Sequence, residues 1–438
     1  MRNYILNINI LFITTLLFSL SFGQTNWTKY PGNPVLRPGS SGEWDEQKIG
    51  ISSVLFDGST YHMWYSASVV GDYFKSIGYA TSLDGTIWTK NNDPSTSNPP
   101  FAESDPVLNP GTAGSWDDDR VALPCVILID TLYHMWYTGA DNPDPNEGAI
   151  GHAISSDGIS WEKDADNPVL NAGSSGSWDD VWVWDPSVVF DGSIYHMWYH
   201  AWNGVGEEVQ IGHATSPHPD SVWTKDPNNP VLNWEYGSWD YPRVQAPCVI
   251  YNGNIFHIWY SAGPTSEYSV GYAKSVDGSE WEKSASNPVL EAGSAGSWDD
   301  TMVGFCTVID SADSIYKMWY TGGNSAGQLA VGYAESDIID GLRDNLLNKI
   351  PLEPSLSQNY PNPFNPITAI SYRLSAVSHV DLSIYNVLGQ KVATLVDKKQ
   401  PAGSHQVQWD ASGFSTGVYY YKLKTEKFQQ IKKMILIK

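Results

Sequence analysis

One aspartate differs from the other carboxylates of this 438-residue chain in its surroundings. Asp185 directly follows Trp184, and Trp182, His200 and Trp202 lie close to it in the sequence. Flat aromatic faces beside a carboxylate are what sugar binding uses, through stacking and hydrogen bonds. These five residues are therefore candidates for a binding site, with Asp185 as its reactive group.

Two interpretations of Asp185 stay open at this point. It is either a functional carboxylate or a residue that caps a turn. For the tryptophans, packing between repeats is the favoured interpretation, because the chain has 20 of them and most recur in every repeat.

Asp185 belongs to the third of five repeats. A Trp-Tyr pair recurs in one framing, and its tryptophans are 72, 62, 61 and 60 residues apart. These tryptophans are Trp64, Trp136, Trp198, Trp259 and Trp319. A period near 60 without helical patterns indicates an array of small sheets rather than one continuous sheet.

Each repeat reads as four short strands. A Gly/Ser loop ending in Trp-Asp precedes an apolar run, and a turn such as Asp57-Gly58 leads into the Met-Trp-Tyr run. Such a turn between two β-rich runs is a hairpin signal. A third run and a Trp-x-Lys strand complete the repeat. The pattern predicts an all-β protein whose residues 24–340 form a five-bladed β-propeller.

The N-terminal strand is expected to close the ring. The fifth repeat lacks its own Trp-x-Lys strand, whereas Trp27-Thr28-Lys29 precedes the first repeat. We expect this segment to supply the outer strand of blade five, which removes an open sheet edge.

Further candidates come from aligning the starts of the inner strands, where propeller ligand sites lie. Lys48, Arg120, Trp182, Arg243 and Met302 share one position. Three residues on, the aligned residues are Ile51, Leu123, Asp185, Ala246 and Phe305, so only blade three has a carboxylate there. In an aligned set before the third strand, Glu208 is the candidate proton donor, against the alternative of a solvated loop charge.

Residues that recur in every blade are expected to be structural. The Trp-Asp aspartates Asp45, Asp117, Asp179, Asp240 and Asp299 are interpreted as loop anchors. His62, His134, His196 and His257 lack metal-ligand spacing, and one residue per blade cannot converge on one ion. We therefore expect no metal and no cofactor.

The two ends of the chain differ from the propeller. Residues 1–23 combine Arg2, an apolar stretch and small residues, which is typical of a secretory signal peptide. No other segment reaches the roughly 20 apolar residues of a membrane span. Residues 341–355 are interpreted as a linker, and residues 356–438 as a separate segment of alternating strands, for which the resemblance described below implies a small β-sandwich.

Net charge changes at the same boundary. Residues 1–340 have 13 basic and 42 acidic residues, a net charge of −29, whereas residues 341–438 have 12 and 6, a net charge of +6. An acidic propeller argues against nucleic acid and against anionic membrane surfaces as partners, because both need a basic footprint.

Two resemblances to known families follow from the motifs. The segment from Gln358 to Pro366, followed by Ile384-Tyr385-Asn386 and Gly417-Val418-Tyr419, resembles the C-terminal sorting domain of the type IX secretion system of Bacteroidetes-like bacteria. This resemblance implies a transport address, the secretion machinery as a partner of residues 356–438, and a secreted or cell-surface protein.

The repeats resemble the five-bladed glycosidase superfamily of arabinanases, β-xylosidases, invertases and mannoside phosphorylases. The shared order is Asn-Pro-Val-Leu, Trp-Asp, Met-Trp-Tyr and Ser-x-Asp-Gly-x-x-Trp, over roughly residues 27–337. Those enzymes mostly place an aspartate at the start of the inner strand of blade one, where this chain has Ile51. The resemblance implies a polysaccharide or oligosaccharide as ligand.

Two functions are therefore considered. The first is a secreted glycoside hydrolase-like propeller in which Asp185 and Glu208 are catalytic, and Lys48, Arg120, Trp182, Trp184, His200, Trp202 and Arg243 bind substrate. Hydrolysis usually needs two such carboxyl groups. A phosphorolytic variant would instead use Asp185 with basic residues that hold phosphate. The alternative function is a non-catalytic propeller that binds glycan or protein at the cell surface.

Overall fold

The computed structural model describes residues 27–69, 74–96, 98–141, 148–310, 315–337, 355–356, 358–359, 361–374, 378–400, 403–425 and 428–437. The expected signal peptide and nearly all of the expected linker lie outside these residues. The chain divides into two compact units, residues 1–339 and 340–438. All regular elements in the described ranges are β-strands. These ranges therefore contain no helix that could span a membrane.

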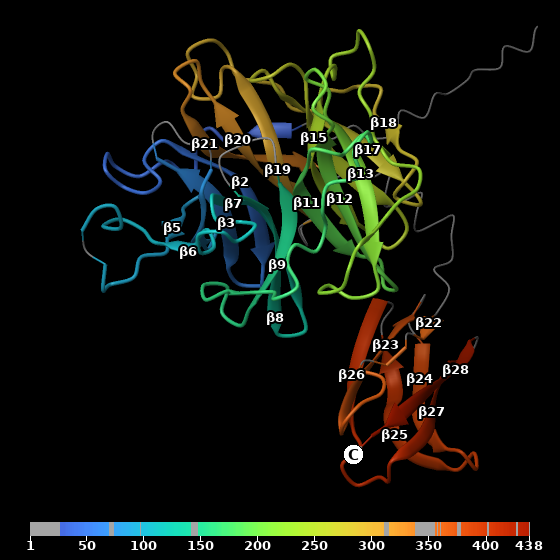
Figure 1. Ribbon diagram of the computed structural model, residues 1–438. Coiled ribbons are helices and arrows are strands. Elements are labelled where there is room, and N and C mark those ends of the chain that lie inside the picture. The colour runs from blue at the N-terminus through green and yellow to red at the C-terminus, as the bar shows by residue number, and fades with distance from the viewer. Residues whose placement is uncertain are drawn as a thin grey trace, which may run out of the picture. The chain divides into compact units, whose positions relative to one another are not determined.

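The N-terminal unit contains five groups of antiparallel strands, which we call sheets one to five in chain order (Figure 1). Sheet one contains β2 (Lys48–Phe56), β3 (Tyr61–Ser68), β4 (Ser76–Ser82) and β5 (Thr89–Lys90), with β6 (Pro106–Leu108) beside β4. Sheet two contains β7 (Arg120–Ile129), β8 (Leu132–Ala140), β9 (Ala149–Ser155) and β10 (Glu162–Lys163). Sheet three contains β11 (Trp182–Phe190), β12 (Tyr195–Trp202), β13 (Gln210–Ser216) and β14 (Thr224–Lys225). Sheet four contains β15 (Val244–Tyr251), β16 (Phe256–Ala262), β17 (Ser269–Ser275) and β18 (Glu282–Lys283). Sheet five contains β19 (Met302–Asp310), β20 (Ile315–Gly323) and β21 (Leu329–Asp337).

The N-terminal strand β1 (Trp27–Lys29) completes sheet five. It pairs antiparallel with β21, so that Trp27 lies opposite Ser336 and Lys29 opposite Ala334. Sheets five and one are also joined by a parallel bridge between Lys48 and Leu329. The two ends of the N-terminal unit are therefore held together by backbone pairing.

The first strands of the sheets contact one another in a cycle. Each of β2, β7, β11 and β15 contacts the next first strand, and β19 contacts β2. Parallel pairing repeats between neighbours, as in the amide of Val183, which donates to the carbonyl of Gly148 at 3.1 Å. The first strands therefore surround one axis.

The core consists of aromatic residues between the sheets. All five repeat tryptophans and the tyrosines that follow them are fully buried. They come from second strands that are covered on both faces, which explains why large buried residues occupy consecutive positions of these strands instead of alternating with exposed polar ones.

A buried ion pair recurs in each sheet and explains the Trp-Asp and Trp-x-Lys motifs. The lysine of the fourth strand contacts the aspartate of the Trp-Asp loop at 2.5–2.7 Å. The pairs are Lys90–Asp45, Lys163–Asp117, Lys225–Asp179, Lys283–Asp240 and Lys29–Asp299. In sheet five the lysine comes from β1, so this ion pair also joins the two ends of the unit.

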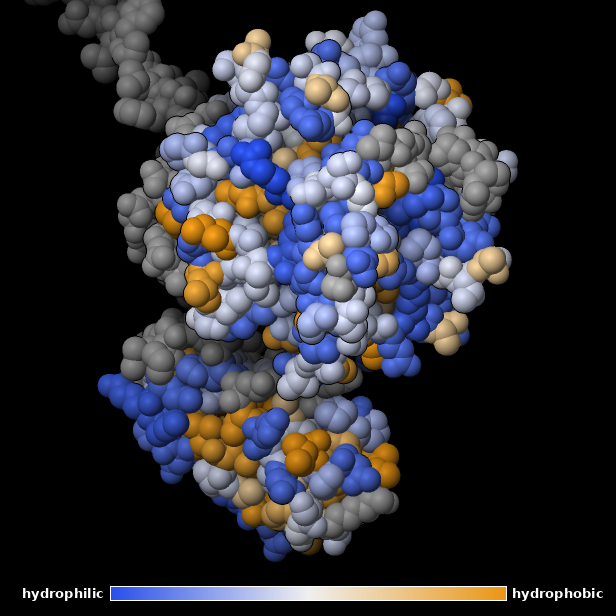
Figure 2. Space-filling view, turned by 90° about the vertical axis from the view of Figure 1, so that its left-hand side faces the viewer, coloured by the Kyte–Doolittle hydropathy of each residue, from blue (hydrophilic) through white to orange (hydrophobic). Residues whose placement is uncertain are grey.

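The C-terminal unit has two sheets. One contains β22 (Ser355–Leu356), β23 (Ile367–Leu374) and β26 (Gly403–Asp410). The other contains β24 (Ser378–Asn386), β25 (Lys391–Gln400), β27 (Gly417–Lys424) and β28 (Gln429–Leu436). One apolar cluster draws on both sheets and includes Ile370, Trp409 and Tyr421. Figure 2 shows orange, hydrophobic residues on this unit, where Val387, Leu388 and Ile431 are exposed.

Candidate functional site

Asp185 lies in a bulge of β11 at the axis of the N-terminal unit. The register of β11 against β12 shifts between Trp184 and Ser187, and Asp185 has a φ of 57°. The aligned Leu123, Ala246 and Phe305 have φ values of 56°, 51° and 47°. The left-handed backbone is therefore a property of this position in the fold, and the carboxylate is what distinguishes sheet three.

The carboxyl group of Asp185 is buried without a hydrogen-bond partner for one oxygen. The residue is 8% exposed, and Oδ2 has no partner among the described residues. Burial raises the pKa of Asp185 to about 8, because removal from water disfavours the charged form. At neutral pH the group is therefore mostly a carboxylic acid, which can donate a proton or a hydrogen bond.

His200 is held in place by the neighbouring sheet. Its Nδ1 accepts a hydrogen bond from the amide of Ala246 at 3.2 Å. In other sheets a hydroxyl takes this role: Ser66 accepts from the Leu123 amide, Thr138 from Asp185 and Ser261 from Phe305. His200 thus has a structural function, which the sequence alignment did not indicate.

His200 and Asp185 do not form an ion pair at neutral pH. Burial and the nearby Arg243 lower the pKa of His200 to about 3. Its Nδ1 lies 3.8 Å from Oδ2 of Asp185, which is beyond hydrogen-bond distance. Between the two pKa values both groups are mostly uncharged, and the histidine positions the carboxyl group by contact.

The three candidate tryptophans form one cluster beside Asp185. Trp182 stacks on Trp184 with ring centroids 4.6 Å apart and lies 6.0 Å from Trp202. The indole Nε1 atoms of Trp184 and Trp202 are buried and have no hydrogen-bond partner among the described residues. The tryptophans therefore pack against one another, as expected, and the N–H groups of Trp184 and Trp202 lack hydrogen-bond partners among the described residues.

The basic candidates lie at the starts of the first strands. Lys48 and Arg120 are the first residues of β2 and β7, and Arg243 directly precedes β15. Arg120 donates to Asp119 at 2.9 Å, so it is already paired with a carboxylate. Arg243 approaches Glu207 at 4.0 Å, and its buried Nε has no partner in the described part of the chain.

Apolar side chains from sheets one, two, three and five form a small cluster that includes two of the bulge residues. Leu123 is buried together with the partly buried Phe74, Trp184 and Phe305. The cavity at the axis has a volume of about 40 Å³ and is lined by Asp185 and residues of every sheet, including Ser53, Cys125, Cys248 and Thr307. A cavity of this size has room for about one water molecule.

Glu208, the second predicted catalytic residue, makes no described contact with Asp185 or the tryptophan cluster. It is exposed in the segment between β12 and β13 and makes no polar contact with other described residues. Burial is the one cause of the raised pKa of Asp185, so no described carboxylate contributes to it. Glu147, from the same aligned set, lies outside the described residues.

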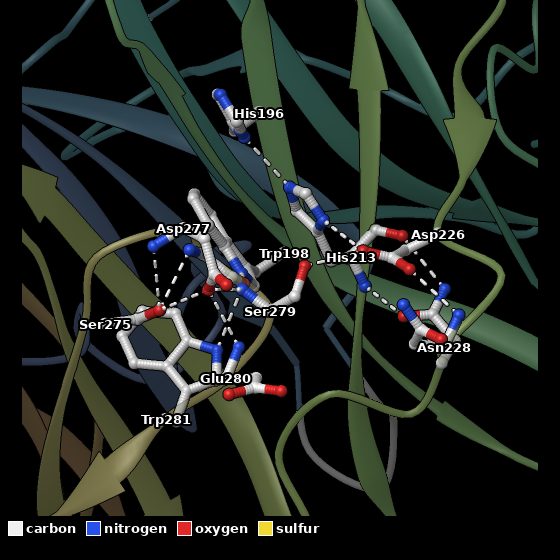
Figure 3. Close-up of polar contacts among 12 residues, drawn as sticks. His196, Trp198, His213, Asp226, Asn228, Ser275, Asp277, Ser279, Glu280 and Trp281 are labelled. Atoms are coloured by element: carbon white, nitrogen blue, oxygen red, sulfur yellow. Dashed lines mark hydrogen bonds and ion pairs between the residues drawn. The ribbon is translucent and has the colours of Figure 1, made fainter.

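The recurring histidines take part in links within and between sheets (Figure 3). His196 Nδ1 lies 3.0 Å from Nε2 of His213, whose Nδ1 lies 3.2 Å from Asp226. Ser279 of the next sheet donates to the same carboxylate at 2.6 Å. This hydroxyl contacts the carboxylate and not the imidazole, so these residues do not have the contact order of a Ser-His-Asp triad. The described residues contain no cluster of three metal-ligating groups.

Comparisons with known proteins match the C-terminal unit to one family and the fold to another group of proteins. Residues 358–438 match the family described as "Secretion system C-terminal sorting domain". This domain directs secretion to the cell surface or the outside of the cell, as the motifs in this segment predicted.

The N-terminal unit is similar to proteins that act on glycans. An uncharacterized protein of Mycobacterium tuberculosis is 28% identical over 243 residues, which are 53% of this chain and 73% of that protein. The 1,2-beta-oligomannan phosphorylase of Thermoanaerobacter is 29% identical over 136 residues, which are 30% of this chain and 41% of the enzyme.

Solved structures show the same fold. A glycoside hydrolase aligns with a TM-score of 0.57 and 17% identity, covering 72% of this chain and 93% of its own. The beta-1,2-mannobiose phosphorylase of Listeria innocua aligns with a TM-score of 0.54 and 15% identity, covering 73% and 98%. The predicted resemblance to this superfamily is confirmed as a likeness of fold, and the sorting domain directs the protein to the cell surface or the outside of the cell.

Proposed function

We propose that the N-terminal unit is a five-bladed β-propeller, with sheets one to five as its blades, that binds a glycan outside the cell beside blade three. The observation that carries the proposal is the group of tryptophans beside Asp185, in which Trp182 stacks on Trp184 and several buried polar atoms lack partners among the described residues. These atoms are Nε1 of Trp184 and Trp202, Oδ2 of Asp185 and Nε of Arg243.

Such a cluster suits a sugar. A buried polar group without a partner costs about 1–3 kcal/mol, and a ligand that supplies the missing hydrogen bond recovers this cost. Sugar hydroxyl groups both donate and accept, so they can satisfy the indole N–H groups and the carboxyl oxygen together. The stacked rings of Trp182 and Trp184 add an aromatic surface of the kind that sugar rings contact.

Glycoside cleavage is the second candidate function, and the raised pKa of Asp185 favours it. An acid that keeps its proton near pH 7 is suited to protonate a leaving oxygen. In hydrolysis Glu208 would be the second carboxylate, whereas in phosphorolysis Lys48, Arg120 and Arg243 would hold phosphate. Binding is the better supported function, because hydrolysis usually needs two carboxyl groups and burial is the one cause of the raised pKa of Asp185, with no second described carboxylate contributing to it.

One experiment separates these functions. The full chain and its Asp185→Asn variant are tested for retention in affinity gels of arabinan, xylan, fructan and mannan, and for release of reducing sugar with and without phosphate. We expect retention by one polysaccharide without release. Release that is lost in the variant would establish cleavage at Asp185, and the absence of both retention and release would contradict the proposal.

A further inference from the structure

A groove with a volume of about 440 Å³ lies between sheets two and three. Trp116, Asp141, Gly148, Ala149, Asn171 and Asp180 are among the residues that line it. Its volume falls in the range of about 300–1,000 Å³ that is usual for ligand pockets. None of the site residues predicted from the sequence lines this groove.

A missing side chain brings the groove next to Trp184, because Gly148 lines the groove and has no Cβ atom. Gly148 shares its register with Lys75, Val209, Tyr268 and Leu329, which precede or begin the third strands of the other sheets. In each of these sheets a side chain extends from that position. A Cβ atom at Gly148 would collide with Nε1 of Trp184, so this indole packs directly against Gly148 and the tryptophan cluster adjoins the groove without lining it.

The next position leaves an amide side chain without the partner that it has in sheets one and three. In sheet one Ser76 donates to Asn109 at 3.0 Å, and in sheet three Gln210 donates to Asn233 at 3.0 Å. The residue aligned with Ser76 and Gln210 is Ala149, which has no donor in its side chain. Asn171, aligned with the two asparagines, is therefore exposed and has no hydrogen-bond partner among the described residues.

A buried carboxylate oxygen repeats this pattern. Asp180 accepts a hydrogen bond from the amide of Gly176 through Oδ2, while its buried Oδ1 has no partner in the described ranges. In sheet five the aligned Asp300 uses its Oδ1 to accept from the amide of Ser325 at 3.1 Å. The groove thus holds an amide and a carboxylate that are paired in equivalent places elsewhere.

We propose that this groove binds further residues of the same glycan chain, and that the chain is neutral. The proposal rests on the proposed function, because it extends a ligand from the tryptophan cluster past Gly148 and outward between the two sheets. Among the described residues of the lining, Asp141 and Asp180 are the charged ones, and none is a lysine or arginine. Carboxylates repel uronic acids, so neutral sugars fit and acidic polysaccharides do not.

The test varies the length of the glycan. Binding to the full chain is measured calorimetrically with di-, tetra- and hexasaccharides of the polysaccharide that retains the protein, and with oligogalacturonates as acidic probes. Ala149→Gln places in the groove the side chain that Gln210 presents to Asn233. Ser76→Gln makes the same replacement at the equivalent position of sheet one and serves as the control.

We expect affinity to rise at least tenfold from the disaccharide to the hexasaccharide in the natural protein and in Ser76→Gln. In Ala149→Gln this rise should disappear while disaccharide affinity stays the same. An unchanged rise in Ala149→Gln would overturn the groove proposal and leave the proposed function intact. Equal or tighter binding of oligogalacturonates would overturn the neutral specificity, and failure of all probes to bind would contradict the proposed function itself.

Discussion

Replacing Asp185 with asparagine should stabilise the protein at neutral pH and not at acidic pH. Asparagine keeps the shape of the side chain and tolerates the left-handed backbone at this position, where φ is 57°. The replacement removes only the possibility of a buried negative charge. The expected effect on stability therefore follows from the pKa of the carboxyl group.

The sign follows from which state holds the proton. The pKa is raised from 3.8 in the unfolded chain to about 8 in the folded protein. Between these values the folded state keeps a proton that the unfolded state has lost, so the free energy of unfolding falls as pH rises. pH 7 is about three units above 3.8, and each unit is worth about 1.4 kcal/mol. The free energy of unfolding at pH 7 is therefore roughly 4 kcal/mol lower than it is below pH 3.8. Asp185→Asn should recover this difference.

Thermal unfolding from pH 4 to pH 9 measures this effect. For the variant we expect a midpoint on the order of 10 °C above that of the natural protein at pH 7, and a difference near zero at pH 4. Glu208→Gln makes the same chemical change at an exposed carboxylate and should not alter the pH profile. A difference between variant and natural protein that stays constant across this range would refute the assignment of a buried, protonated Asp185.

Three further predictions concern single contacts. Lys29→Ala leaves the buried Asp299 without its cation and should lower the free energy of unfolding, measured by urea titration, by roughly 3–5 kcal/mol. Lys274→Ala, which removes an ion pair with the exposed Glu282, should lower it by under about 1 kcal/mol in the same titration. His200→Ser keeps an acceptor for the Ala246 amide and should preserve stability, while His200→Ala should cost about 1–3 kcal/mol; equal losses would argue against this structural role. Trp184→Phe removes an unpartnered N–H group and should weaken glycan retention about tenfold without loss of thermal stability, and a stability loss without a binding change would mark the tryptophan as purely structural.

Much of the fold could be predicted because each repeat carries its own local signals. The Met-Trp-Tyr runs, the Asp-Gly turns and the Trp-x-Lys strands correspond to strands and turns in register from sheet to sheet. The Trp-Asp aspartates were expected to anchor loops, and their pairing with the fourth-strand lysines supplies the physical reason. The sorting domain was recognisable because its motifs occur in order within one continuous segment.

The candidate site was less accessible to sequence reasoning, because its properties depend on neighbours from other repeats. Alignment identified Asp185 as the single carboxylate among the bulge residues. It could not indicate that Phe305 lines the same small cavity as Asp185, or that His200 accepts a hydrogen bond from the amide of Ala246. The groove beside Gly148 was missed because its signal is a missing side chain, which acquires meaning only when sheets two and three face each other.

By itself, the sequence determined the number of repeats, the strands within them, the acidic character of the N-terminal unit and the secretion address. These features depend on residues close together in the chain, where periodicity and turn chemistry operate. Only the tertiary structure decided that Asp185 keeps its proton near neutral pH and that one groove opens between sheets two and three. Burial and unsatisfied hydrogen bonds arise from contacts between residues far apart in sequence, so they exist only after the sheets have packed.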